Sequence, residues 1–223
     1  MRKAKPTNRG NQILAASAVM VILTFVITLY VYQVLPQTMI SHWGINGEAN
    51  GFMPKEAGAW IVPIISIALL ALLYYIPRLD PLKANIEKFK SAYHVLIAAL
   101  CGFFLYLQVI MLAINLGTNI NMTQLLIPAL GILFIVIGVI LPMTKRNYFI
   151  GIRTPWTLHS DKVWDDTHRI GGRVFTVAGL IVFLSAFASP EHTFVLVFTS
   201  IIAAVAITII YSYKSFKSLK NRK

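Results

Sequence analysis

Six long runs of apolar residues, separated by polar segments, constrain this chain more than any other feature. A helix needs roughly 20 apolar residues to cross the hydrocarbon core of a bilayer. Helices satisfy their own backbone hydrogen bonds in lipid, and the alternating pattern of a membrane barrel is absent from these runs. The sequence therefore predicts an all-α, polytopic membrane bundle of six transmembrane helices, over residues 12–35, 58–77, 92–116, 124–142, 174–188 and 193–213.

The fifth run is the shortest, so its helix is expected either to begin earlier, within 169–173, or to cross a locally thin region of the membrane with little tilt. Composition agrees with a membrane protein, because 57% of the residues are hydrophobic and 13% are charged. Soluble domains carry about 45–50% apolar and about 25% charged residues.

The 20 Lys and Arg residues flank the apolar runs and give a formal net charge of +12. They form no stripe on a folded surface, so we predict no direct nucleic-acid binding. All of them except Lys55 fall in the N-terminal tail, the second and fourth connections and the C-terminal tail. The positive-inside rule then predicts that both termini are cytoplasmic. The expected halves are 1–91, with two spans and a long outer loop at 36–57, and 92–223, with four spans and a structured inner loop at 144–173.

The apolar runs contain no Asp, Glu, Lys or Arg, although ion pathways and proton relays need such groups. The sequence also lacks the metalloprotease, phosphate-loop and paired-cysteine motifs, and it has one cysteine. We therefore predict a protein that is not an enzyme and has no cofactor. A facilitator of a small neutral molecule stays an alternative, with a polar path lined by Ser66, Gln108, Asn115 and Thr208.

The inner loop carries the signals of a short amphipathic helix over 161–170. Ser160 is a suitable N-cap, and Asp161 lies in the first turn, where the helix dipole favours negative charge. Gly171 and Gly172 are expected to end or bend this helix. Such a helix would lie in the headgroup region, with Trp164 at the boundary.

A metal site in the same loop is the second interpretation of its polar residues. Four possible ligands fall close together, but their spacing matches no standard zinc pattern, so no metal site is predicted. These residues are His159, Asp161, Asp165 and His168. Their plain interpretation is a solvated helix face.

The outer loop is much longer than the other two outer connections, and it holds two Asn-Gly turn signals, at 46–47 and 50–51. The stretch LPQTMISHWGINGEANGFMPK resembles the outer-loop signature of a family of bacterial and archaeal membrane proteins of unknown function. The matching positions are Pro36, His42, Trp43, Asn46, Gly47, Gly51 and Lys55.

The inner stretch RNYFIGIRTPWTLHSDKVWDDTHRIGG resembles the signature of the SdpI immunity proteins. Tyr148, within this stretch, is counted with the predicted site. The matching positions are Asn147, Gly151, Arg153, Thr154, Pro155, Trp156, Thr157 and Trp164, followed by His168 and Gly171.

The resemblance implies a multi-pass protein of a prokaryotic cell membrane that protects its cell from a secreted, membrane-active peptide toxin. It also implies a signal receptor that holds a cytoplasmic autorepressor at the membrane. On this basis the bilayer, a peptide toxin and an autorepressor are the expected partners. The outer-loop residues are predicted to contact the toxin, except Pro36, which belongs to the signature alone. The inner-loop residues are predicted to dock the repressor or to hold the loop in shape.

Overall fold

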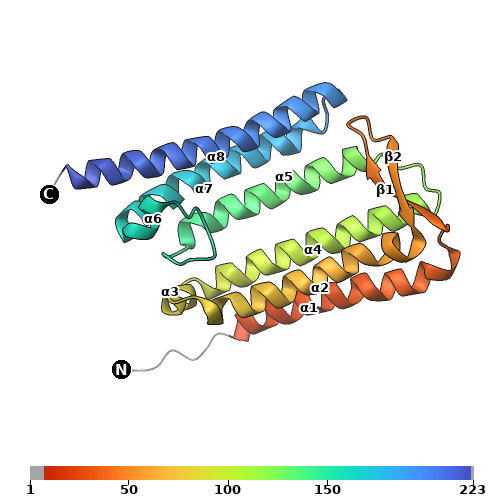
Figure 1. Ribbon diagram of the computed structural model, residues 1–223, viewed down its shortest axis with the longest axis horizontal. Helices are drawn as coiled ribbons and strands as arrows, with labels where there is room; N and C mark the ends of the chain where they lie inside the picture. The colour runs from red at the N-terminus through yellow and green to blue at the C-terminus, as the bar shows by residue number, and fades with distance from the viewer. Residues whose placement is uncertain (1–7, 222–223) are drawn as a thin grey trace.

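The computed structural model, which describes residues 8–221, is a bundle of six long helices that lie side by side (Figure 1). All six are long and apolar enough to cross a membrane, so the predicted six-helix, all-α bundle is confirmed. The long helices are α1 (Asn8–Val31), α2 (Lys55–Leu79), α4 (Lys90–Asn115), α5 (Met122–Ile140), α7 (Asp161–Ser185) and α8 (Pro190–Lys220).

Shorter elements cover the two ends of the bundle. One end, here called the hairpin end, carries an antiparallel pair of strands (Figure 1). At the other, the terminal end, α1 begins and α8 ends. The short elements are the 3-10 helices η1 (Tyr32–Val34) and η2 (Leu141–Met143), the helices α3 (Lys83–Glu87) and α6 (Pro155–His159), and the strands β1 (Thr38–Trp43) and β2 (Ala49–Pro54).

The helices pack in two groups of three. The first group is α1, α2 and α4, the second is α5, α7 and α8, and α4 joins them by packing on α5. In Figure 1 the groups lie one above the other, with α4 and α5 adjacent. In its packing, α4 thus belongs to the same group as α1 and α2. The division into halves at residues 91 and 92, which was predicted from the sequence, stays a prediction.

Glycines bring α5 and α7 into backbone contact. A Cβ on Gly131 would lie 2.6 Å from the Phe183 nitrogen, and one on Gly172 would lie 2.7 Å from the Gly138 oxygen. A Cβ on Gly179 would lie 2.7 Å from the Gly131 oxygen. Small residues at membrane helix interfaces allow this close approach, which maximises van der Waals contact.

The predicted end of a helix at Gly171 and Gly172 is wrong, because α7 runs unbroken from Asp161 to Ser185. The start expected for the fifth span, within 169–173, is wrong for the same reason. Gly172 meets Pro142, just beyond the end of α5, so the part of α7 before it projects past α5 at the terminal end. One face of that part is buried under the connecting segment and the other carries exposed charged residues, which is why the apolar run looked short.

The expected position of Trp164 at the membrane boundary is also wrong, because its side chain is 0% exposed. It lies in the projecting part of α7, under the connecting segment. Its Nε1 donates a hydrogen bond to the Thr144 carbonyl at 3.2 Å. Trp164 is therefore a packing residue and not an interfacial anchor.

Candidate functional site

The outer loop folds as a hairpin, and the end of α4 holds one of its edges. Asn115 accepts a hydrogen bond from the Ile40 nitrogen at 2.7 Å and donates one to the Ile40 oxygen at 3.1 Å. Its amide therefore pairs with β1 as a neighbouring strand would. On the face toward the bundle, Met39 is 0% exposed and lies against Gly58 of α2.

The turn of the hairpin is fixed to the start of α5. Gly47 has φ +81°, a conformation that suits glycine, and a Cβ there would collide with the Asn121 amide. Asn121 donates to the Asn46 carbonyl at 3.1 Å and accepts from the Gln124 nitrogen at 3.1 Å as the N-cap of α5. One side chain thus positions both the turn and the helix.

The outer edge of β2 is free. In an antiparallel pair, opposite residues exchange two hydrogen bonds or none, in alternation. The backbone groups of Ile40 are taken by Asn115, so the Ile40–Phe52 pair is a non-bonded one. The backbone N–H and C=O of Phe52 therefore face away from β1, and no residue between 8 and 221 is bonded to them across that edge. The Phe52 side chain is 61% exposed.

At the terminal end, the segment between η2 and α6 is built around Asn147, which is 0% exposed. Its Nδ2 donates to the carbonyls of Lys145 and Ile150 at 2.8 and 2.9 Å. Its Oδ1 accepts from the nitrogens of Phe149 and Ile150 at 2.9 and 2.6 Å. All four hydrogen-bonding positions of one amide are used, so this side chain dictates the path of the segment.

His168 holds the next part of the same segment. Its Nδ1 donates to the Trp164 carbonyl and its Nε2 accepts from the Ile152 nitrogen, at 2.8 and 2.9 Å. The ring stacks on Trp164, with centroids 4.0 Å apart. Gly151, at φ +114°, passes so close that a Cβ would collide with Nε2, which confirms the sharp turn predicted at this glycine.

Short helix α6 follows, and two threonines cap it reciprocally. Thr154 accepts from the Thr157 nitrogen at 3.2 Å, and the Thr157 hydroxyl accepts from the Thr154 nitrogen at 2.9 Å. The Thr154 hydroxyl also donates to the Ser212 hydroxyl of α8 at 3.1 Å. Pro155 occupies the first turn, where its missing N–H costs nothing.

Asp80 ties the first helix group to this segment, and sequence reasoning missed it. It is 2% exposed and accepts from the nitrogens of Leu82 at 2.6 Å and Tyr148 at 2.8 Å. Nearby, the Asn85 amide donates to the Arg146 carbonyl at 2.9 Å. No signal in the sequence links Asp80 to Tyr148, because the two are 68 residues apart.

Two family models match this chain. A domain of unknown function, DUF1648, covers residues 19–67, which include the hairpin. The SdpI/YfhL protein family covers residues 143–212, which include the segment around Asn147 and His168. A relative, Immunity protein SdpI of Bacillus subtilis (strain 168), is 27% identical over 208 residues, which are 93% of this chain and 97% of that protein. Over most of its length the chain is thus similar to an SdpI immunity protein, and residues 143–212 match the SdpI/YfhL family.

No solved structure matches the chain. Six helices that can span a membrane, together with the similarity to an SdpI immunity protein, make it a multi-pass protein of the cell membrane. Both loops that were singled out from the sequence lie inside the matched regions.

Most of the predicted outer residues lie on the hairpin. His42 and Asn46 are exposed, and the His42 ring is bonded to Asn50. Trp43 is half-buried against the apolar cluster at the ends of α4 and α5. Gly47 lies in the turn, and Gly51 lies opposite His42 in the strand pair.

Lys55 lies apart from the other predicted outer residues. It is 6% exposed and begins α2 beneath the hairpin. Its Nζ lies 3.5 Å from the Gln33 carbonyl and 4.7 Å from the centre of the Tyr32 ring. Phe52, on the exposed edge, is the hairpin residue that the sequence did not single out.

The predicted inner residues divide into a buried set and an exposed set. The buried set holds the segment in shape and comprises Asn147, Thr154, Thr157, Trp164 and His168. In the exposed set, Tyr148 is 47% exposed, and Arg153 donates to its carbonyl at 2.7 Å. Phe149, 37% exposed, lies beside them in the sequence, while half-buried Trp156 packs against Tyr213.

The four residues of the metal interpretation are not brought together. Both ring nitrogens of His168 are already bonded within the protein. Asp161 pairs with Arg146 at 2.6 Å, and Asp165 pairs with Lys145 at 3.1 Å. Among residues 8–221, no group of three or more metal-ligating side chains is found.

The four polar positions of the facilitator alternative are buried and bonded to protein carbonyls. Gln108 donates to Ala59 at 3.0 Å and to the Thr28 hydroxyl at 2.7 Å, and so links three helices. Asn115 holds the hairpin, as described above. Ser66 and Thr208 donate to carbonyls of their own helices, at 2.8 and 2.9 Å. These contacts are structural, and they favour no polar path.

Proposed function

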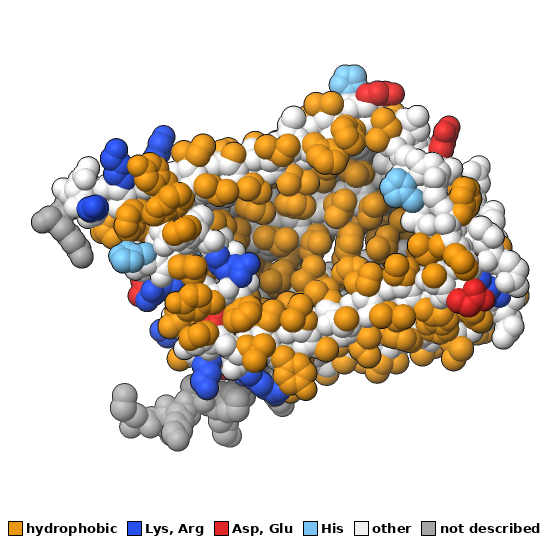
Figure 2. Space-filling view, viewed as in Figure 1, with side chains coloured by type: hydrophobic (Ala, Val, Ile, Leu, Met, Phe, Trp, Pro, Cys, Tyr) orange, Lys and Arg blue, Asp and Glu red, His pale blue; other side chains and the backbone are white. Residues whose placement is uncertain are grey.

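We propose that this protein protects its cell from a secreted, membrane-active peptide, which it contacts at the hairpin end. Similarity to an SdpI immunity protein over most of the chain supports the activity. The charges support the orientation, because the described Lys and Arg residues gather at the terminal end, apart from Lys55, while exposed acidic residues mark the hairpin end (Figure 2). By the positive-inside rule the hairpin then faces outward and both termini are cytoplasmic.

The observation that carries the proposal is the free edge of β2. An exposed strand edge with unpaired N–H and C=O groups is a template for an extended peptide, which adds as a further strand. Phe52 offers both backbone groups and a large exposed ring at that edge. Because the hairpin is fastened on its other edge and inner face, a captured peptide would be held at the membrane surface before it inserts.

A survival assay tests the proposal. The intact protein is expressed in a sensitive bacterium, which is challenged with a membrane-active peptide of the kind that SdpI-type proteins resist. Phe52→Pro removes the outward N–H, whereas Phe52→Leu keeps the backbone and an apolar side chain. Proline is tolerated at a strand edge, so the hairpin is expected to persist.

We expect protection by the natural protein and by Phe52→Leu, and loss of protection with Phe52→Pro. Arg153→Ala, at the opposite end, should protect normally. Failure of the natural protein to protect against any such peptide would overturn the immunity proposal. Equal protection by the proline and leucine variants would show that the free edge of β2 is not the peptide contact.

We also propose that a cytoplasmic autorepressor docks at the terminal end. Three exposed side chains, Tyr148, Phe149 and Arg153, support this, because aromatic and arginine side chains dominate binding hot spots. They lie on a segment whose interior is fixed by Asn147, so the surface is preorganised. A membrane capture assay with Tyr148→Ala and Arg153→Ala tests this, and unchanged capture of the repressor by both variants would contradict it.

A further inference from the structure

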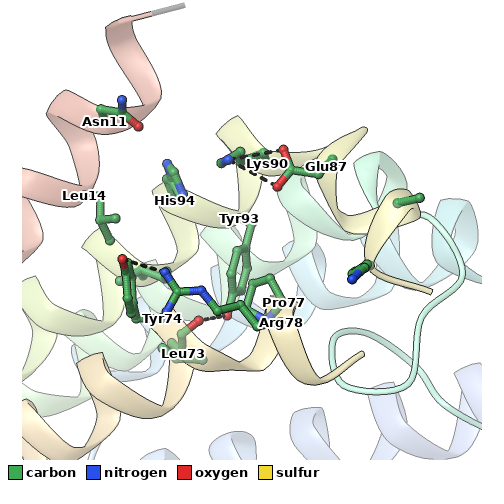
Figure 3. A pocket seen from close by; sticks show the side chains of 13 residues that line it. Asn11, Leu14, Leu73, Tyr74, Pro77, Arg78, Glu87, Lys90, Tyr93 and His94 are labelled. Carbon is green, nitrogen blue, oxygen red and sulfur yellow. Dashed lines mark hydrogen bonds and ion pairs between the residues drawn. The ribbon is translucent and has the colours of Figure 1, made fainter. Parts of the chain in front are cut away.

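A cavity of about 630 Å³ opens at the terminal end, and neither proposed contact region uses it. It lies where α1, α2, α3 and α4 meet, so it belongs to the first helix group (Figure 3). Its charged lining residues are Arg78, Lys83, Glu87 and Lys90. Three bases and one acid give the cavity a net positive charge.

The acid neutralises one of these bases. Lys90 lies 3.2 Å from Glu87, and Figure 3 shows this pair at one side of the cavity. Within residues 8–221, no carboxylate lies within ion-pair distance of Arg78 or Lys83. Two cationic groups are thus left for an anion.

Aromatic contacts hold Arg78 in place. Its Nη2 donates to the Tyr74 hydroxyl at 2.8 Å, and its guanidinium carbon lies 4.4 Å from the centre of that ring. A stacked guanidinium keeps its planar set of donors while its position is fixed. Figure 3 shows the side chain extended across the cavity toward Tyr74.

Buried polar side chains form the wall behind these cations. Tyr93 is 2% exposed and donates to the Leu73 carbonyl. His94 is 6% exposed and donates through Nδ1 to the Gly10 carbonyl at 2.8 Å, which ties α4 to α1. The cavity therefore has a fixed polar wall within the protein.

An apolar groove of about 510 Å³ continues from the cavity along α1 and α2. The groove shares Asn11, Leu14 and Tyr74 with the cavity. Its remaining residues are apolar or aromatic, and small side chains leave it open, at Ala15, Ala18 and Ala71.

The combined length of the cavity and the groove fits one leaflet of a bilayer. On α2 the two hollows extend from Ile67 to Arg78, which is about 16 Å of helix at a rise of 1.5 Å per residue. Half of the hydrocarbon core is about 15 Å. The cationic cavity and the apolar groove thus lie end to end over about the length of one leaflet.

We propose that this combined hollow binds an anionic phospholipid. The phosphate lies against Arg78 and Lys83, and one acyl chain lies in the groove between α1 and α2. Basic pockets between transmembrane helices on the cytoplasmic side bind acidic lipid head groups, and the cytoplasmic leaflet is the one rich in them. The site is distinct from the hairpin and from the exposed set around Arg153.

Native mass spectrometry of the purified full-length protein tests the proposal, with phosphatidylglycerol, phosphatidylcholine and glycerol 3-phosphate as probes. Arg78→Gln combined with Lys83→Gln removes the cations, and Ala18→Leu fills the groove. Lys145→Gln combined with Lys162→Gln is the matched charge control, and Ala206→Leu on the exposed side of α8 is the matched groove control. Circular dichroism confirms that each variant is folded.

We expect saturable binding of phosphatidylglycerol in preference to phosphatidylcholine. Loss of both cations should weaken it about thirtyfold, since each base near a membrane surface contributes about 1 kcal/mol and about 1.4 kcal/mol is a factor of ten. Ala18→Leu should weaken it several-fold, and both controls should bind normally. Equal binding of the two lipids, equal losses in variants and controls, or displacement of the lipid by glycerol 3-phosphate would overturn the proposal.

Discussion

The two ends of the bundle carry loops that are held in opposite ways. At the terminal end, the stretch from η2 to the first turns of α7 folds around buried polar groups of its own, and Asn147, Thr157 and His168 are each 0% exposed. The hairpin has no such interior and is held by Asn115 and Asn121, which belong to other elements. The terminal segment is therefore a fixed cap with a few exposed side chains, whereas the hairpin presents a free backbone edge.

The largest expected effect is at the centre of the terminal segment. Asn147→Ala leaves two donors and two acceptors of the backbone without their partner. We expect the free energy of unfolding in detergent micelles to fall by about 3 kcal/mol or more. Asn46→Ala, in the exposed hairpin turn, should change it by less than about 0.5 kcal/mol. Similar losses in both variants would mean that the two loops are held alike.

The contact between α5 and α7 reaches Pro142, next to the start of the terminal segment. In Gly172→Ala the new Cβ would lie 2.6 Å from Pro142 and 2.7 Å from the Gly138 oxygen. We expect a loss of about 1–3 kcal/mol in the same unfolding measurement. Gly102→Ala is the matched control, because its Cβ would make an ordinary contact, 3.6 Å from Met20. A loss in the control alone would contradict the packing described.

Substitution of Asp80 is expected to lower the free energy of unfolding less, because Asp80 holds the terminal segment at one residue, Tyr148. Asp80→Asn places an amide N–H group against one of two backbone donors, so stability should fall by about 1–2 kcal/mol. Glu87→Gln, whose carboxylate is largely exposed, should be nearly neutral. Unfolding curves for the two variants check this, and coincident curves would show that Asp80 is not a tie between the helix groups.

The smallest effect on global stability is expected at the hairpin. Asn115→Ala frees the β1 edge, but Ile40 lies at the end of the bundle, where water replaces the lost partners. We expect a loss of about 1 kcal/mol. Amide hydrogen exchange should become faster in the hairpin and stay unchanged around Asn147. Faster exchange at both ends would show that they are coupled.

Sequence reasoning found the features that depend on local chemistry. The six apolar runs gave the spans, Ser160 caps α7 by accepting from the Val163 nitrogen at 3.4 Å, and Gly151 makes a sharp turn. It failed where contacts between residues far apart in the sequence determine the structure. Gly171 and Gly172 resemble a helix end, yet packing against α5 and the Ile152 side chain keeps them inside α7.

The hairpin was missed for a related reason. The turn signal at Asn46-Gly47 was recognised, but the flanking strands lack a clear alternation because a bulge interrupts their register near His42. The edge of β1 is paired with Asn115, which is 75 residues from Ile40 in the sequence. No local pattern shows which edge such a side chain covers, and so none shows which edge is free.

Photo-crosslinking tests most directly whether the hairpin, and not the terminal segment, meets the peptide. A benzophenone-bearing phenylalanine analogue replaces Phe52 in one protein and Phe149, an exposed aromatic of the terminal segment, in another. Intact cells are irradiated with a labelled membrane-active peptide of the kind used in the survival assay. Crosslinking from position 52 and none from position 149 is the result predicted here. Crosslinking from position 149, or from neither, would contradict the assignment of the free hairpin edge as the peptide contact.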